Sequence, residues 1–148
     1  MDIVFNIICS FICGYYVSII MAKYSIFCQV RLTIFAICRG FSYGAIDGNL
    51  EFAEFPRYTE IADNASNLIY LGHKKAGEEA LKIFKEVANT RFSVEQYNSF
   101  LLAKRPITPG SSADITFDTI SERCSEWQMR SQQLKPSLYV LFSLIPRL

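Results

Sequence analysis

The feature that most constrains this chain is an uncharged, apolar run close to its start. No charged side chain occurs from Ile3 to Ala22, and a helix needs about 20 apolar residues to cross the hydrocarbon core of a bilayer. The sequence therefore divides into three parts. These are a signal or membrane-anchor segment over residues 1–23, a helical domain over residues 24–136, and an apolar C-terminal tail over residues 137–148.

Three interpretations of the first segment are open: a cleaved export signal, a retained anchor, or an upstream extension of a gene that starts at Met21. An export signal usually begins with a basic region and ends at a cleavage site with small residues two positions apart. Here the acidic Asp2 stands where the basic region would be, and the residue two positions before Ala22 is Ile20, which is not small. We nevertheless expect export, cleaved or anchored, and hence a periplasmic or membrane-anchored protein.

The basic residues after the apolar run bear on its orientation. Lys23, Arg31 and Arg39 all follow it. For a retained anchor, the positive-inside rule would keep the C-terminal side of the span in the cytoplasm. An anchor whose domain faces the cytoplasm is therefore the main competitor to export.

Helical spacing of apolar residues dominates after residue 24. It predicts an all-α fold, with a small helical domain of four to five helices behind the apolar N-terminal segment. The expected helices cover residues 24–46, 59–71, 74–88, 93–104 and 112–132, and residues 49–58 form a connection. The stretch from Leu138 to Ile145 is too short to span a membrane as a helix. It could pack on the domain, pair as a short strand or form a disordered end.

The clearest local signal is a capping box at Ser93. The Ser93 hydroxyl can accept a hydrogen bond from the Gln96 amide, and the Gln96 side chain can return to the Ser93 amide. Phe92 and Tyr97 are placed for a hydrophobic staple around it. The pattern predicts that a new helix starts at Ser93. Further along, the stripe that carries Trp127 predicts that this side chain lies in the core.

Residues suited to catalysis are scarce. His73 is the only histidine, and it lies at a helix junction, where we expect it to contact a helix C-terminus. Acidic residues are dispersed, and no phosphate-binding loop or hydrolase motif occurs. A net charge of +1 gives no basic footprint for nucleic acid. We therefore expect no enzyme activity, no cofactor, no metal and no nucleic-acid partner.

The five cysteines divide between the apolar run and the domain. Cys9 and Cys13 lie inside the run, where they act as small apolar residues. No CxxC pair occurs, which argues against a zinc site. Cys28, Cys38 and Cys124 remain for the folded part, and an exported domain this small would gain stability from a disulfide.

Two stretches together resemble a known family. The first is Cys38-Arg39-Gly40-Phe41-Ser42-Tyr43-Gly44-Ala45-Ile46-Asp47. The second is Phe92-Ser93-Val94-Glu95-Gln96, followed by Phe100, Pro106 and Cys124. Both are similar to motifs of the Rap/Tai group of type VI secretion immunity proteins. The resemblance implies an all-helical periplasmic protein without a cofactor, which binds a cell-wall amidase effector and blocks its active site.

The resemblance also implies a disulfide between Cys38 and Cys124 that ties the first helix of the domain to its last. Each residue lies on an apolar helical face, and closing so long a loop would restrict the unfolded chain. Cys28 is the competitor for either partner.

A binding element for such a partner is expected between Arg105 and Ser112. Pro106 and Pro109 limit the freedom of this loop, and a rigid loop loses less entropy on binding. Arg105, Pro106 and Ser111 are the candidate contact residues. The competing interpretation is that the loop only reverses the chain between two helices.

The alternative function is that of a membrane-anchored helical adaptor or assembly protein. In that case residues 3–22 contact the membrane uncleaved, the domain stays reduced in the cytoplasm, and the partner is a different protein. A homodimer is compatible with both functions.

Overall fold

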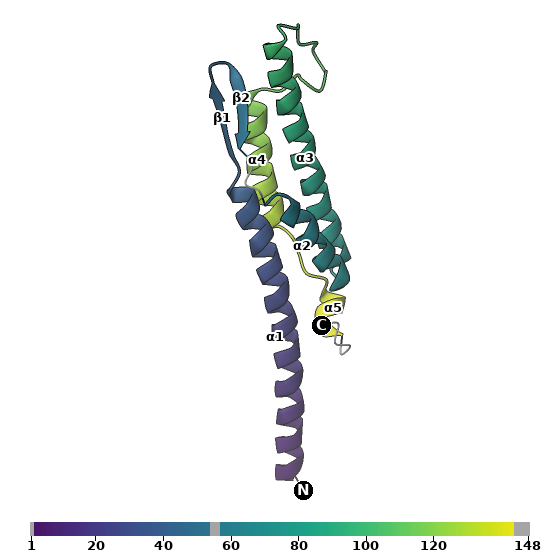
Figure 1. Ribbon diagram of the computed structural model, residues 1–148. Helices are drawn as coiled ribbons and strands as arrows, with labels where there is room; N and C mark the ends of the chain where they lie inside the picture. Colours follow the sequence, from purple (N-terminus) through teal and green to yellow (C-terminus); the bar gives the residue numbers. More distant parts are fainter. Residues whose placement is uncertain (1, 54–56, 144–148) are drawn as a thin grey trace.

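The computed structural model describes residues 2–53 and 57–143 and confirms the all-α prediction (Figure 1). The described residues form five helices and one small two-stranded sheet. The elements are α1 (Asp2–Arg39), β1 (Ser42–Ile46), β2 (Asn49–Ala53), α2 (Thr59–Tyr70), α3 (Lys74–Leu102), α4 (Phe117–Gln132) and α5 (Leu138–Phe142).

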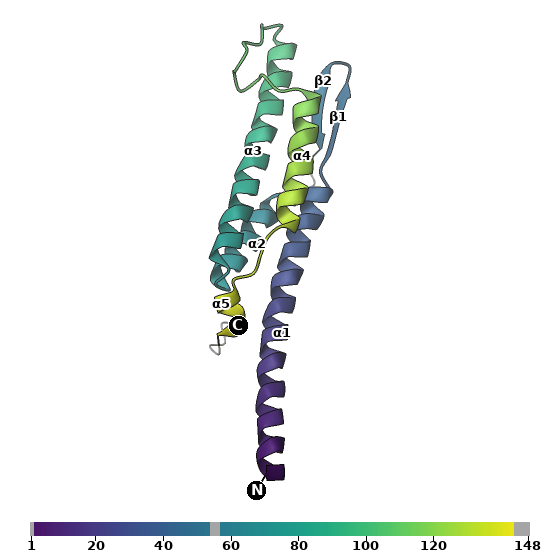
Figure 2. The ribbon, with the colours of Figure 1, turned by 180° about the vertical axis from the view of Figure 1, so that it is seen from behind.

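Helix α1 is a single unbroken helix with two different halves. Its N-terminal half projects beyond the rest of the molecule, whereas its C-terminal half lies against α2 and α4 (Figures 1 and 2). Phe27, Ile34 and Cys38 in the C-terminal half are fully buried. The helix predicted over residues 24–46 is therefore part of a longer one, and its predicted end is wrong because α1 stops at Arg39.

A β-hairpin follows α1 where the sequence predicted a helix end and a connection. Strands β1 and β2 pair antiparallel from Ser42 opposite Ala53 to Ile46 opposite Asn49. The two residues between them, Asp47 and Gly48, have φ angles of 50° and 82°. Two consecutive positive φ values characterise the type I′ turn that matches the twist of a hairpin.

The hairpin is fixed to the helices by its inner face. The side-chain amide of Asn98 on α3 accepts from Leu50 N at 3.0 Å and donates to Leu50 O at 2.7 Å. Phe41 and Phe52 lie against Trp127, with ring centroids 6.0 and 6.4 Å from that of the indole. Trp127 is fully buried, as predicted.

Helices α2 and α3 form a close antiparallel pair. Helix α2 matches its prediction, and Gly72 follows its end with a φ of 89°, which is the usual role of glycine after a helix. The backbones approach most closely at Gly77. A β-carbon built there would lie 2.5 Å from Ile69 Cγ1 and 2.6 Å from the carbonyl oxygen of Ala65.

Helix α3 continues through the predicted break at Ser93, so two predicted helices are one. From Gly77 onward its buried face is spaced at three and four residues, and the face consists of Ala76, Gly77, Ala80, Ile83, Val87, Thr90 and Val94. Arg91 Nε lies 2.9 Å from Glu95 Oε1 across the predicted boundary. The capping-box residues are compatible with a helix interior, and no Gly or Pro occurs between Gly77 and the end of the helix at Leu102.

Helix α4 starts later than predicted because Thr116, not Ser112, caps it. Thr116 Oγ1 accepts from Thr119 N at 3.2 Å. Polar contacts join α4 to α3 on one side, where Arg123 Nη1 donates to Thr90 Oγ1 at 2.9 Å. On the other side, Tyr43 Oη in β1 lies 2.8 Å from Ser121 Oγ.

Candidate membrane-facing site

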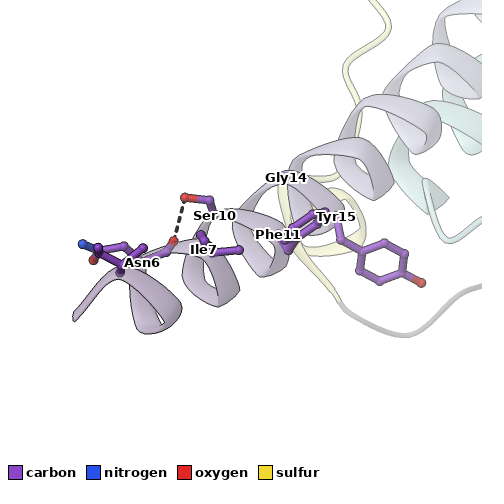
Figure 3. Close-up of a pocket in the computed structure, with 7 residues that line it drawn as sticks. Asn6, Ile7, Ser10, Phe11, Gly14 and Tyr15 are labelled. Carbon is purple, nitrogen blue, oxygen red and sulfur yellow. Dashed lines mark hydrogen bonds between the residues drawn. The ribbon is translucent and has the colours of Figure 1, made fainter. Parts of the chain in front are cut away.

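The projecting half of α1 has the properties of a membrane span. It belongs to the one helix among the described residues that is long and apolar enough to cross a bilayer. Its large apolar side chains are exposed, for example Ile3 at 76% and Phe11 at 76%. Figure 3 shows the groove along one face of this segment, between Asn6 and Tyr15.

Two serine hydroxyls of the projecting half are satisfied within the helix. Ser10 Oγ donates to Asn6 O at 2.8 Å (Figure 3), and Ser18 Oγ donates to Gly14 O at 2.9 Å. In hydrocarbon each unsatisfied polar group costs several kcal/mol. These two hydroxyls therefore add little to the cost of burying the segment in lipid.

The short helix α5 lies beside α1 at the point where the projecting half of α1 meets the domain (Figures 1 and 2). Lys23 Nζ donates to Ser143 O at 2.6 Å and to Val140 O at 3.2 Å. Tyr16 Oη donates to Phe142 O at 2.8 Å. Two donors of α1 thus satisfy the carbonyl groups at the C-terminal end of α5. The sequence marked Lys23 only as a topology signal and did not predict this contact.

His73 fixes the segment that leads from α4 to α5. Its side chain is 2% exposed, and Nδ1 accepts a hydrogen bond from Ser137 N at 3.0 Å. The Phe27 ring lies edge-on against the imidazole, with centroids 4.8 Å apart. Burial lowers the pKa of His73, which favours the neutral ring. As predicted, His73 contacts a helix C-terminus, because its backbone N–H donates to Leu68 O in the last turn of α2 at 2.8 Å. The imidazole itself, however, accepts a hydrogen bond and places no positive charge there.

A basic groove opens beside His73. It lies between the start of α3 and residues 133–138, and its charged lining residues are Lys74, Lys75, Glu79, Arg130 and Lys135. Arg130 and Glu79 pair with each other at 2.7 Å. The other three charged side chains that line the groove are lysines, so its lining carries a net positive charge.

The predicted binding loop lies at the opposite end of the molecule. Arg105 and Pro106 are exposed in the connection between α3 and α4, far from the start of α1 (Figure 1). Asp114 Oδ2 accepts from Gly110 N at 2.7 Å and orders the turn. The Ser111 hydroxyl oxygen is buried and has no hydrogen-bond partner among the described residues. The structure thus keeps Arg105, Pro106 and Ser111 together in one loop.

Cys38 and Cys124 both lie in the core, but no disulfide joins them. The described cysteines are free thiols, and none of them lie at disulfide-bonding distance. Burial raises the pKa of Cys38 to about 12, with the Ser131 hydrogen bond opposing the shift and the Cys124 thiol adding to it. Burial raises the pKa of Cys124 to about 11. Both thiols are therefore protonated and poorly nucleophilic at neutral pH.

No metal site is evident in the part of the chain that the structure describes, where no three His, Cys, Asp or Glu side chains gather. Comparison with known proteins adds no relative: no protein family, curated protein or solved structure matches this chain.

Proposed function

We propose that this protein is a membrane-anchored, non-catalytic adaptor or assembly protein that holds a protein partner at the membrane surface. One observation carries this proposal. Helix α1 is continuous from its exposed apolar half into the buried half that forms part of the domain core. Because no break separates the two halves, a bilayer that holds residues 3–22 also holds the domain.

Retention of the span is supported by its contact with α5. Tyr16 lies inside the segment that cleavage near Ala22 would remove, and it donates to Phe142 O. Lys23, directly after that point, is 9% exposed and bonded to the same end of α5. Cleavage would remove one of these donors and expose the other.

The orientation of the domain is argued from charge. The positive-inside rule counts Lys and Arg within about 15–20 residues of a span. Lys23, Arg31 and Arg39 satisfy it on the domain side. Charge therefore favours a domain in the cytoplasm, where an adaptor would act.

A second candidate is inhibition of a secreted cell-wall amidase, as the resemblance at residues 38–47 and 92–96 implies. The exposed loop over Arg105 to Ser111 supports it, because an ordered loop at the far end from the anchor is suited to block an enzyme cleft. This function requires export of the domain.

Topology separates the two functions. The full chain would be fused at its C-terminus either to alkaline phosphatase, which is active only after export, or to a fluorescent protein that folds in the cytoplasm. The adaptor proposal expects fluorescence, no phosphatase activity, an intact N-terminus and resistance to alkaline extraction from membranes. A mature N-terminus beyond Ala22 would exclude the anchor.

The amidase hypothesis has its own test. The purified chain would be mixed with a cell-wall amidase encoded by a neighbouring gene, and peptidoglycan hydrolysis would be measured. Inhibition that is lost on Arg105→Ala with Pro106→Ala, and kept on the matched exposed change Lys85→Ala, would support both the function and the loop.

A further inference from the structure

We infer that the end of the domain nearest the span is a binding surface for anionic phospholipid headgroups. The surface consists of α5, which would enter the interfacial layer, and of the lysines of the basic groove beside it. This inference rests on the proposed anchoring by α1 and adds a second, lipid-selective contact to it.

The first argument is the exposed apolar surface of α5. Leu138 is 67% exposed and Tyr139 82%, whereas Leu141 is buried against the domain. Tyr70, at the end of α2 before the groove, is 73% exposed. Tyrosine is enriched where a protein crosses the membrane–water boundary, because its ring is apolar and its hydroxyl is polar.

The second argument is depth. The contacts of α5 with α1 fall at Tyr16 and Lys23, which are about 10 Å apart along a helix. If residues 3–22 fill the hydrocarbon core, this part of α1 occupies its outer edge and the headgroup layer. Interfacial helices insert to a comparable depth, about 5–10 Å. Unbonded carbonyl groups would be costly there, and Lys23 and Tyr16 remove that cost.

The third argument is charge. Lys75 and Lys135 line the basic groove, and neither has a carboxylate at ion-pair distance among the described residues. Lys74 pairs only loosely with Glu78, at 3.8 Å on an exposed surface. Lysines held beside a bilayer attract anionic headgroups. The combination of lysines with an exposed apolar helix thus points to a lipid surface as the occupant.

The test uses the full chain in vesicles and tryptophan quenching by brominated lipids. The native Trp127 is fully buried in the domain, so the unmodified chain gives the background. A Tyr139→Trp variant would report on α5, and Phe92→Trp, which replaces an exposed residue on α3, would be the control. Phe142→Trp provides a second reporter on α5 if Tyr139→Trp fails to fold.

Brominated phosphatidylcholine and brominated phosphatidylglycerol would be compared at equal fractions. We expect quenching of the α5 tryptophan but not of the Phe92→Trp control, and stronger quenching by phosphatidylglycerol. Adding Lys75→Gln and Lys135→Gln should bring the ratio of the two quenching constants down to one. The matched pair Lys85→Gln and Lys104→Gln, which removes the same charge elsewhere, should leave the ratio unchanged.

The possible failures are distinguishable. If the chain does not float with the vesicles, the anchor itself is refuted, and this inference with it. If the chain floats but the α5 tryptophan is quenched no more than the Phe92→Trp control, the anchor stands and the interfacial surface is refuted. Equal quenching by the two lipids would overturn the assignment to anionic headgroups. An equal loss of selectivity in the Lys75→Gln, Lys135→Gln variant and in the Lys85→Gln, Lys104→Gln variant would overturn it as well.

Discussion

Trp127 Nε1 donates a 2.9 Å hydrogen bond to Glu86 Oε2, the same oxygen that accepts Arg130 Nη1 at 2.7 Å. The indole is fully buried on α4, whereas the carboxylate comes from α3. A single oxygen thus satisfies one buried neutral donor and one charged donor. This pairing links α3 to α4 through polar side chains.

Replacing Glu86 should therefore cost more than an ordinary surface change. Glu86→Ala leaves the indole N–H without an acceptor, and an unsatisfied buried donor costs about 1–3 kcal/mol. Glu86→Gln keeps an acceptor oxygen and should lose less. Denaturation in detergent, followed by Trp127 fluorescence, measures both. Equal losses for the two variants would show that the hydrogen bond to the indole contributes nothing.

Gly77→Ala should destabilise the domain although alanine is the better helix former. The propensity gain is about 1 kcal/mol, but the new methyl group would overlap Ile69 Cγ1 and the Ala65 carbonyl oxygen. Overpacking of this kind costs about 1–3 kcal/mol, and a backbone oxygen cannot move aside alone. We expect a lower midpoint of thermal unfolding. Gly44→Ala, where no atom lies within 4 Å of the new carbon, is the control and should change little.

His73 should make stability depend on pH. The pKa of His73 in the folded protein lies below the ordinary value of 6.5, so His73 binds a proton more readily in the unfolded chain. The stability that neutral His73 contributes is therefore fully present above about pH 6.5, and it is lost as the pH drops toward the pKa of His73 in the folded protein. Protonation of Nδ1 would also break the bond from Ser137, and Lys74, Lys75 and Lys135 in the adjoining groove oppose a further positive charge.

To test this, the free energy of unfolding of the wild type and of His73→Asn would be measured across this pH range and compared. His73→Asn carries an acceptor oxygen but cannot titrate there. Its stability should be flat between pH 7 and the folded pKa of the wild type, apart from changes that both proteins share. A wild-type curve parallel to that of His73→Asn would contradict the assignment.

Lys23→Met should release α5 from α1. The methionine side chain fills similar space but cannot donate to the carbonyl groups of Val140 and Ser143. Chymotrypsin should then cleave faster after Tyr139 in detergent solution. The exposed change Lys85→Met should leave the rate unaltered. An unchanged rate in Lys23→Met would mean that Leu141 and Tyr16 alone hold α5.

The helical architecture was predictable because apolar spacing is a local signal. The hairpin was also within reach, since Asp47-Gly48 is a strong turn signal between two short apolar segments. The helical prediction extended across the hairpin because Phe41 and Ala45 continue the helical spacing of α1 by chance. The break predicted at Ser93 failed for the opposite reason: a local cap pattern was outweighed by a continuous buried face from Ala76 to Val94.

The contacts of the membrane-facing site could not be predicted from local patterns. Lys23 and Ser143 are 120 residues apart, and His73 and Ser137 are 64 apart. Nothing near Lys23 distinguishes a lysine that caps another helix from one that marks a membrane boundary. Only the path of α1 past the end of α5 shows that Lys23 caps another helix.

With the anchoring proposed above, the straight course of α3 would make the domain a spacer of defined height. This helix runs from the basic groove at Lys74 to the loop that follows Leu102 (Figure 1), and 29 residues correspond to about 43 Å. With its lower end at the lipid headgroups, the Arg105–Ser111 loop would stand about 40 Å above the bilayer. A protein held there would be kept clear of the lipid and presented to neighbours of similar height, so that lengthening or shortening α3 by whole turns would change which neighbours it meets.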